Sequence, residues 1–209
     1  MEKIFAIGDI HGCLDKLESL LCKIPADLDR DMMVFLGDYV DRGPDSFKVL
    51  ELLLDLKKKH GERMIFLQGN HEWMFSRYIE DNSFRSFLFT GGRKTLESYP
   101  VQDGCPEIPP SHMEFLKELT PVYETEQYIF VHAGLKPGIP VSRQRPEDLL
   151  WIRSEFIRSS YDWGKRVIFG HTPFFQPLIE ANKVGIDTGA VFGGQLTCLS
   201  LPDFEFFFA

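Results

Sequence analysis

Three short apolar runs in the first 72 residues alternate with two stretches in which leucines recur at helical spacing. The apolar runs span residues 4–7, 32–36 and 64–67, and the leucine-rich stretches span residues 14–24 and 44–60. Short apolar runs are typical of buried strands, whereas a 3.6-residue period is typical of helices. The order strand, helix, strand, helix, strand predicts a parallel sheet with right-handed crossovers.

The rest of the sequence predicts a helical segment followed by further strands. Residues 73–120 carry aromatic side chains among charges, so we expect helices, one of them at 112–119, and a loop that cover one edge of the core. We expect strands at 127–131 and 166–169, then successive short antiparallel strands at 177–180, 183–187, 196–201 and 204–208. No repeat or long linker divides the sequence, which predicts a single α/β domain over residues 1–209, with two packed sheets and helices outside.

Composition and charge exclude several classes of protein. The net charge of −8 argues against a general nucleic-acid binder, which would show a basic surface. The longest uncharged run, residues 188–202, is too short and too polar to span a membrane, and the first residues do not form a signal peptide. Four cysteines without C-x-x-C spacing predict reduced thiols. We therefore expect a cytoplasmic protein with no nucleic-acid or membrane partner.

Five predicted strands end in glycine-flanked segments that carry acidic, amide or imidazole side chains. These segments are residues 8–12, 37–43, 69–72, 132–134 and 170–172, and they contain four of the six histidines. Ligands of open α/β folds bind beyond the carboxyl ends of strands, and glycine lets the backbone come close to them. One crevice is therefore expected to collect Asp9, His11, Asp38, Asp41, Arg42, Asn70, His71, His132 and His171.

Several carboxylates in one crevice repel one another unless cations neutralise them. Carboxylate, imidazole and amide ligands together suit Mn, Fe or Zn, so we expect two divalent ions, with Mn²⁺ favoured and Fe or Zn as alternatives. Asp38 can bridge the two ions, and a pair of ions can stabilise both oxygens of a phosphoryl displacement. In this interpretation Asp9 and His11 chelate one ion, and Asn70, His132 and His171 bind the other.

The five motifs GDIHG, GDYVDRG, GNHE, HAG and GHT together resemble the metal-dependent phosphoprotein phosphatase (PPP) family. The sequences at 151–153, 168–173 and 186–192 are similar to its small bacterial and phage branch, which includes bacteriophage lambda phosphatase. The resemblance covers residues 8 to about 194 and implies a calcineurin-like metallophosphoesterase fold, with a dinuclear metal site at the carboxyl ends of the strands. Pro173 stands where broader metallophosphoesterases carry the second histidine of Gly-His-x-His, which implies one protein ligand fewer.

The resemblance also implies a role for each site residue. A hydroxide that bridges the metals attacks phosphorus, and His71, oriented by Asp41, is the general acid. Arg42 and Arg153 hold the phosphoryl oxygens, while Glu72 receives no role at the metals. The implied ligands are Asp9, His11 and Asp38 for the first metal, and Asp38, Asn70, His132 and His171 for the second.

Three functions are consistent with these motifs. The leading hypothesis is a serine/threonine protein phosphatase, with dual specificity left open, that acts on phosphorylated proteins or peptides. The alternative is a symmetrical diadenosine tetraphosphate hydrolase, for which Arg143, Arg145 and Arg158 could supply charge for a longer polyphosphate. A remote alternative is a non-catalytic phosphate-binding module. Residues 187–194 are either a rim of the pocket or a glycine-rich turn between strands.

Overall fold

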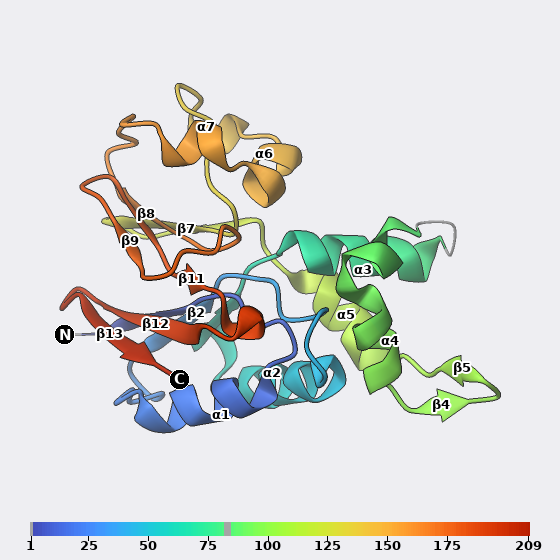
Figure 1. The fold of residues 1–209 in the computed structure, drawn as a ribbon. Helices are drawn as coiled ribbons and strands as arrows, with labels where there is room; N and C mark the ends of the chain where they lie inside the picture. The colour runs from blue at the N-terminus through green and yellow to red at the C-terminus, as the bar shows by residue number, and fades with distance from the viewer. Residues whose placement is uncertain (1, 82–84) are drawn as a thin grey trace.

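The computed structural model describes residues 2–81 and 85–209, and two β-sheets packed face to face form its centre (Figure 1). The first sheet has the strand order β11-β12-β1-β2-β3, and β13 pairs with β12. β1, β2 and β3 are parallel, as the alternation of strands and helices predicts. The strands of this sheet are β1 (Ile4–Ile7), β2 (Met32–Phe35), β3 (Met64–Phe66), β11 (Asp187–Thr188), β12 (Gln195–Leu201) and β13 (Glu205–Phe208).

The second sheet has the order β6-β7-β8-β10-β9 and is also mixed. Its strands are β6 (Val122–Glu124), β7 (Tyr128–Val131), β8 (Arg166–Phe169), β9 (Leu178–Ile179) and β10 (Lys183–Gly185). The predicted antiparallel pairing after residue 176 is confirmed for β9 with β10, for β11 with β12 and for β12 with β13. β10 also pairs in parallel with β8, which the sequence did not predict. β9 lies at the outer edge of the sheet. The chain then turns back as β10, which lies between β9 and β8, and continues into the first sheet.

Helices cover the outer faces of both sheets (Figure 1). α1 (Leu14–Lys23) and α2 (Ser46–His60) cover the first sheet, while α6 (Pro146–Trp151) and α7 (Ser154–Ile157) cover the second. The second helix, predicted over residues 44–60, begins two residues later, at Ser46. The Asp45 amide donates to the Gly12 carbonyl at 3.1 Å, which keeps this residue in the preceding turn.

The segment from 73 to 120 is mostly helical, as expected, and lies to one side of the sheets (Figure 1). It contains a two-stranded hairpin that the sequence did not predict, and its last helix begins at Pro110 instead of His112. Its helices are α3 (Asn70–Glu80), α4 (Arg93–Ser98) and α5 (Pro110–Glu118), and its hairpin strands are β4 (Val101–Gln102) and β5 (Cys105–Pro106). Residues 2–81 and 85–209 also contain four short helical turns: η1 (Gly61–Arg63), η2 (Leu88–Gly92), η3 (Val141–Arg143) and η4 (Ala190–Phe192).

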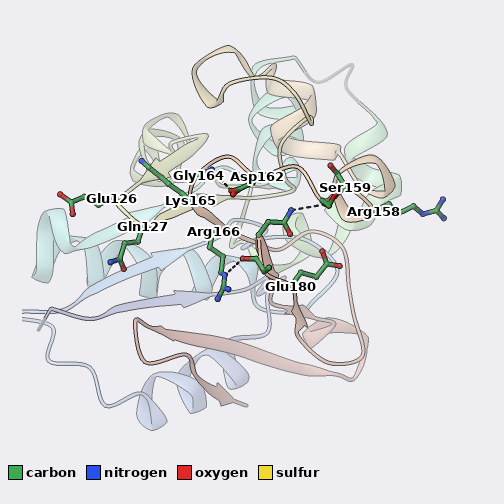
Figure 2. Close-up of a pocket in the computed structure, with 12 residues that line it drawn as sticks. Glu126, Gln127, Arg158, Ser159, Asp162, Gly164, Lys165, Arg166 and Glu180 are labelled. Carbon is green, nitrogen blue, oxygen red and sulfur yellow. Dashed lines mark hydrogen bonds between the residues drawn. The ribbon is translucent and has the colours of Figure 1, made fainter.

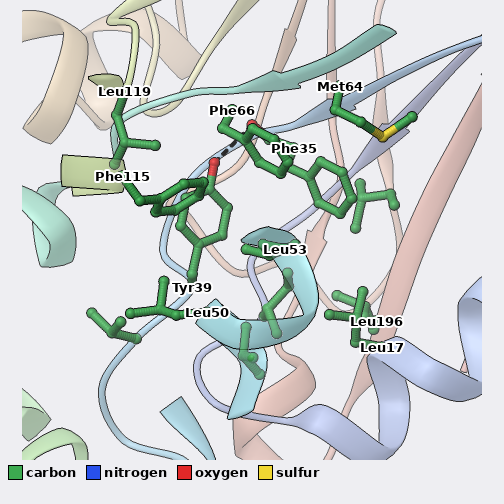
Figure 3. Close-up of a cluster of buried hydrophobic side chains, with 14 of the residues drawn as sticks. Leu17, Phe35, Tyr39, Leu50, Leu53, Met64, Phe66, Phe115, Leu119 and Leu196 are labelled. Atoms are coloured by element: carbon green, nitrogen blue, oxygen red, sulfur yellow. Dashed lines mark hydrogen bonds between the residues drawn. The ribbon is translucent and has the colours of Figure 1, made fainter. Parts of the chain in front are cut away.

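Buried apolar side chains fill the spaces between these layers. Figure 3 shows the cluster between the first sheet and its helices. The buried hydroxyl of Tyr39, a member of this cluster, lies 2.7 Å from the Leu67 carbonyl, to which it donates. Ala6, Val34 and Phe130 belong to a second cluster between the two sheets. Full burial of one large apolar side chain contributes about 1.5–3 kcal/mol, so these clusters fix the sheets firmly. This shared layer supports the prediction of a single domain, which stays a prediction.

Two further sequence expectations concern cysteines and membranes. All four cysteines, at positions 13, 22, 105 and 198, are free thiols, as predicted. Within residues 2–81 and 85–209, no helix has both the length and the apolar character needed to cross a bilayer.

Candidate functional site

The loops that follow β1, β2, β3, β7 and β8 meet, and they bring nine of the ten predicted site residues into contact with one another. The backbone of these loops is unusual, because five of their non-glycine residues have positive φ: His11, Asp38, Asp41, Arg42 and His171. Non-glycine residues rarely adopt this conformation, and such strain gathers at functional sites. The tenth residue, Arg153, is exposed in the turn between α6 and α7, and among the described residues no hydrogen bond joins its side chain to the other nine.

The Asp38 carboxylate is at the centre of the site. Its Oδ2 atom lies 3.4 Å from His11 Nε2, and its Oδ1 atom lies 3.4 Å from His132 Nε2. Asp38 belongs to two groups whose ligand atoms all lie within 4.8 Å of one another, the first with His11 and His71, the second with His132 and His171. Asp38 is therefore the residue best placed to serve two neighbouring ions.

The protonation of the histidines fits metal ligands. His11 Nδ1 lies 2.8 Å from the Val40 carbonyl and His132 Nδ1 lies 2.8 Å from the Leu36 carbonyl, so each Nδ1–H donates to the backbone. Burial lowers the pKa of His11 to about 3 and also lowers that of His132, so both rings are neutral. Each Nε2 lone pair is then turned toward Asp38, and a backbone bond at the far nitrogen is the usual way to orient a metal-binding imidazole.

Several acceptors face one another with no proton between them. His132 Nε2 lies 3.0 Å from Asn70 Oδ1, and both atoms are acceptors when the ring is neutral and this amide oxygen faces it. His171 Nε2 is buried and has no hydrogen-bond partner in the described part of the chain. Burial lowers the pKa of His171 to about 2, so this ring is also neutral and has one nitrogen lone pair for a cation. A cation satisfies such a set of atoms, whereas a hydrogen-bond network does not.

Asp9 is held differently from its predicted partner His11. Both oxygens of Asp9 accept the backbone N–H of His171, at 3.1 and 3.0 Å, and within the described chain Asp9 belongs to neither close group of ligand atoms. Burial and the charges of Asp187 and Asp38 raise the pKa of Asp9. Because a divalent cation would relieve this repulsion, Asp9 fits a ligand at the edge of the site.

His71 differs from the other three histidines of the site. Its Nδ1 atom lies 2.6 Å from Asp41 Oδ2, and its Nε2 atom lies 3.9 Å from Asp38 Oδ2. Burial by itself lowers the pKa of His71, but the carboxylates of Asp38 and Asp41 outweigh burial and raise it. The imidazolium form is thus favoured at this position only, which suits a proton donor better than a metal ligand.

Two residues outside the predicted set hold these groups in place. Thr95 Oγ1, from α4, donates to Asp41 Oδ1 at 2.5 Å and accepts the Asp41 N–H at 2.8 Å. Glu72 accepts four backbone N–H groups, from Asp38, Tyr39, Val40 and Gly69, at 2.7–3.1 Å. The motif GNHE pointed to Glu72, but sequence reasoning considered only its place at a helix start and missed that it fixes the loop of Asp38. No sequence signal pointed to Thr95.

Arg42 is the phosphate-binding candidate that contacts the cluster. The backbone N–H of Arg42 donates to the Gly91 carbonyl at 3.2 Å. One of its guanidinium nitrogens touches His11 Nε2, and its guanidinium lies 5.4 Å from the Phe192 ring centroid. This contact places Phe192 beside Arg42, and the segment that carries Phe192 is the glycine-rich turn between β11 and β12, one of the two predicted alternatives for residues 187–194. Arg153 lowers the pKa of His132 and His171 by its charge, after burial as the main cause, so it lies within electrostatic reach.

The additional arginines considered for a longer polyphosphate lie in other hollows. Arg158 lines a cavity of about 700 Å³ with Lys165 and Arg166 (Figure 2), beside the amino ends of β7 and β8. His132 and His171 follow the opposite ends of these strands, so Arg158 is wrongly placed to serve the cluster. Arg143 and Arg145 line a hollow of about 380 Å³ together with Lys136.

Comparisons with known proteins agree with this geometry. Over 98% of this chain and 90% of the relative, the sequence is 28% identical to the protein named bis(5'-nucleosyl)-tetraphosphatase PrpE [asymmetrical] from Oceanobacillus iheyensis. The crystal structure of a provisionally assigned diadenosine tetraphosphatase superposes with a TM-score of 0.79 at 24% identity, covering 100% of this chain and 93% of that one. A serine/threonine phosphatase from Saccharomyces cerevisiae superposes with a TM-score of 0.67 at 17% identity, covering 96% and 72%.

These findings confirm the predicted fold and correct the predicted branch. At such identities the two superpositions show the fold alone. The named relative is a tetraphosphatase and not a member of the lambda phosphatase branch, and its name specifies asymmetrical cleavage where the sequence analysis considered symmetrical hydrolases. The family model described as calcineurin-like phosphoesterase matches residues 2–197. The chain therefore belongs to the calcineurin-like phosphoesterase family.

Proposed function

We propose that this protein hydrolyses dinucleoside tetraphosphates asymmetrically, so that one molecule of substrate and one of water give a nucleoside triphosphate and a nucleoside monophosphate. The observation that carries the reaction class is the buried cluster of carboxylate and imidazole ligand atoms around Asp38, which suits divalent cations. The substrate class is supported by the PrpE relative, which matches almost the full length of this chain. A phosphoprotein substrate, the leading hypothesis from sequence, gains no support from that relative.

We assign the cations to the ligands expected from sequence: Asp9, His11 and Asp38 for one, and Asp38, Asn70, His132 and His171 for the other. When bound, two divalent ions supply positive charge to the phosphoryl oxygens and promote ionisation of a water molecule. Mn²⁺ is our first candidate, with Fe or Zn as alternatives. The cytoplasmic location also stays a prediction.

The chain's own residues would do the remaining work. Arg42 lies against the cluster, where its planar guanidinium can pair with two phosphoryl oxygens at once. Arg153 can approach from the turn between α6 and α7. His71 would hold a proton on Nε2, the nitrogen that faces the cluster, while Asp41 keeps the ring oriented through Nδ1. This proton is available to the oxygen that leaves phosphorus.

Product analysis tests the proposal directly. The purified chain is incubated with diadenosine tetraphosphate and Mn²⁺, and the nucleotides are separated by anion exchange. We expect ATP and AMP in equal amounts; two molecules of ADP would show symmetrical cleavage instead. A phosphoserine peptide at the same concentration measures the phosphatase alternative, and a higher kcat/KM for the peptide would overturn our choice. Asp38→Asn is the inactive control in both assays.

A further inference from the structure

The loop between β11 and β12 presents a large aromatic side chain to solvent beside the candidate site. Phe192 is 66% exposed at the end of η4, the short red helical turn after β11 in Figure 1. An exposed phenylalanine of this size contributes little to the core. Its ring nevertheless has a defined neighbour, because the guanidinium of Arg42 lies 5.4 Å from its centroid. Arg42 in turn touches His11, so Phe192 is two contacts away from the Asp38 cluster.

Hydrogen bonds on both sides of Phe192 fix the loop that carries it. Lys16, on α1, donates from Nζ to the Ala190 carbonyl at 2.8 Å and to the Gly194 carbonyl at 2.5 Å. The N–H groups of Phe192 and Gly194 both donate to the Gly189 carbonyl at 2.9 Å. The backbone that carries the exposed ring is therefore fixed before any ligand arrives, which lowers the entropic cost of binding.

The chemistry beside this ring indicates what it would bind. Arg42 is the group we assign to the phosphoryl oxygens, and in a nucleotide one ribose separates the phosphate from the base. A base that stacks on an aromatic ring gains about 1–3 kcal/mol, whichever base it is. Arginine can stack on a ring with its plane while its N–H edge pairs with phosphate. A nucleoside phosphate held by Arg42 thus has an open aromatic surface within reach of its base.

We propose that Phe192 is the stacking platform for the nucleobase nearest the phosphate that Arg42 binds. This inference rests on the proposed function, since a nucleotide substrate is what makes such a platform useful. It predicts that the protein distinguishes nucleotides from other phosphates by the presence of a base, with little selection among bases.

The test compares two ligands that differ only in the base. Binding of AMP and of ribose 5-phosphate to the full chain loaded with Mn²⁺ is measured by calorimetry, for the wild type and for Phe192→Ala, Phe192→Leu and Phe192→Trp. We expect the wild type to prefer AMP. Phe192→Ala and Phe192→Leu should weaken AMP binding by about 5- to 150-fold and change ribose 5-phosphate binding less than about twofold. Phe192→Trp should retain the preference.

A matched control is available at the opposite end of the first sheet. Phe204 also carries an arginine over its ring, with the Arg166 guanidinium 4.7 Å from the centroid, but it follows β12 near the start of β1. Phe204→Ala should leave AMP binding unchanged. Equal loss of both ligands in Phe192→Ala, or no preference for AMP in the wild type, would overturn the platform even if diadenosine tetraphosphate is cleaved. Failure to cleave diadenosine tetraphosphate would overturn the proposed function even if AMP binding depends on Phe192.

Discussion

The imidazole of His71 and the carboxylate of Asp41 form a buried pair, 2.6 Å apart, on the side of the ring that faces away from the Asp38 cluster. Of the four histidines in the site, His71 is the one whose pKa is raised. The pair thus keeps a proton ready at the nitrogen that points into the site, and its importance depends on how much the leaving oxygen needs that proton.

Replacing His71 should affect substrates unequally. The alkoxide released from a phosphoserine ester is a strong base, whereas a nucleotide leaves as a phosphate anion that needs little protonation. We expect His71→Asn to slow hydrolysis of a phosphoserine peptide by about 10²–10⁴-fold. Hydrolysis of diadenosine tetraphosphate should be slowed far less. In the wild type, kcat/KM for the peptide should fall as pH rises through the raised pKa of His71. Equal slowing of both substrates with unchanged metal content would contradict a proton-donating role.

Thr95 should act through this pair. Thr95→Val removes the hydroxyl that donates to Asp41 Oδ1 and keeps nearly the same side-chain shape. We expect a loss of about 1–2 kcal/mol in the free energy of unfolding and slower turnover of the phosphoserine peptide. In the His71→Asn background the same change should leave peptide turnover nearly unaffected, because residues that act as one unit are not additive. Additive losses in this double-mutant cycle would argue that Thr95 is merely structural.

Substitutions of Asp38 and of Asp9 should lower the metal content of the protein by different amounts. Asp38 has φ of 53°, a conformation that asparagine tolerates, so Asp38→Asn keeps the backbone while it weakens the ligand shared by both groups. We expect about two bound ions in the wild type, about one in Asp9→Asn, and less than one in Asp38→Asn, measured by elemental analysis after equilibrium dialysis. Equal stoichiometry in the two variants would exclude a bridging Asp38.

Local sequence pattern was sufficient to predict the strand ends and the side chains that follow them. It succeeded because short apolar runs fix the strands of the first sheet, and the carboxyl ends of parallel strands must share one edge. It was insufficient for β10, whose parallel pairing with β8 depends on which edge β9 occupies. That choice is made by packing over the whole sheet.

The local sequence pattern also could not predict contacts between segments that are distant in the sequence. The hydrogen bonds of Glu72 join residues up to 34 positions apart, and the bond from Thr95 to Asp41 joins residues 54 positions apart. A threonine on an ordinary helix carries no local sign of such a partner. The motifs therefore identified the groups that do chemistry, whereas the groups that orient them became visible only in the fold.

Replacing Glu72 should lower the free energy of unfolding by more than its position at a helix start suggests. In Glu72→Gln one carboxylate oxygen becomes an NH₂ group, which cannot accept the two N–H donors that the oxygen binds. Buried donors left without a partner cost about 1–3 kcal/mol each, so we expect at least that loss in urea unfolding, together with reduced activity. Glu80→Gln, at an exposed ion pair on the same helix, is the matched control and should change stability by less than about 1 kcal/mol. Similar losses in both variants would contradict the role assigned to Glu72.

A buried histidine outside the site should make stability depend on pH. His112 Nε2 lies 2.7 Å from Glu51 Oε1 and His112 Nδ1 lies 2.7 Å from the Tyr99 hydroxyl, so the neutral ring donates to Glu51 and accepts from Tyr99. Burial lowers the pKa of His112 even though Glu51 opposes this shift. The unfolded chain therefore takes up the proton first. Stability from this group is complete above its unfolded pKa of 6.5 and is lost as pH falls from 6.5 toward the lowered pKa.

His112→Gln retains an amide that can donate to Glu51 but does not titrate. We expect the variant to be less stable than the wild type near neutral pH and to show a smaller loss of stability between pH 6.5 and about 5, with the difference in slope at most about 1.4 kcal/mol per pH unit. Urea unfolding at several pH values measures both slopes. Parallel slopes for His112→Gln and the wild type would show that the buried ring does not carry this pH dependence.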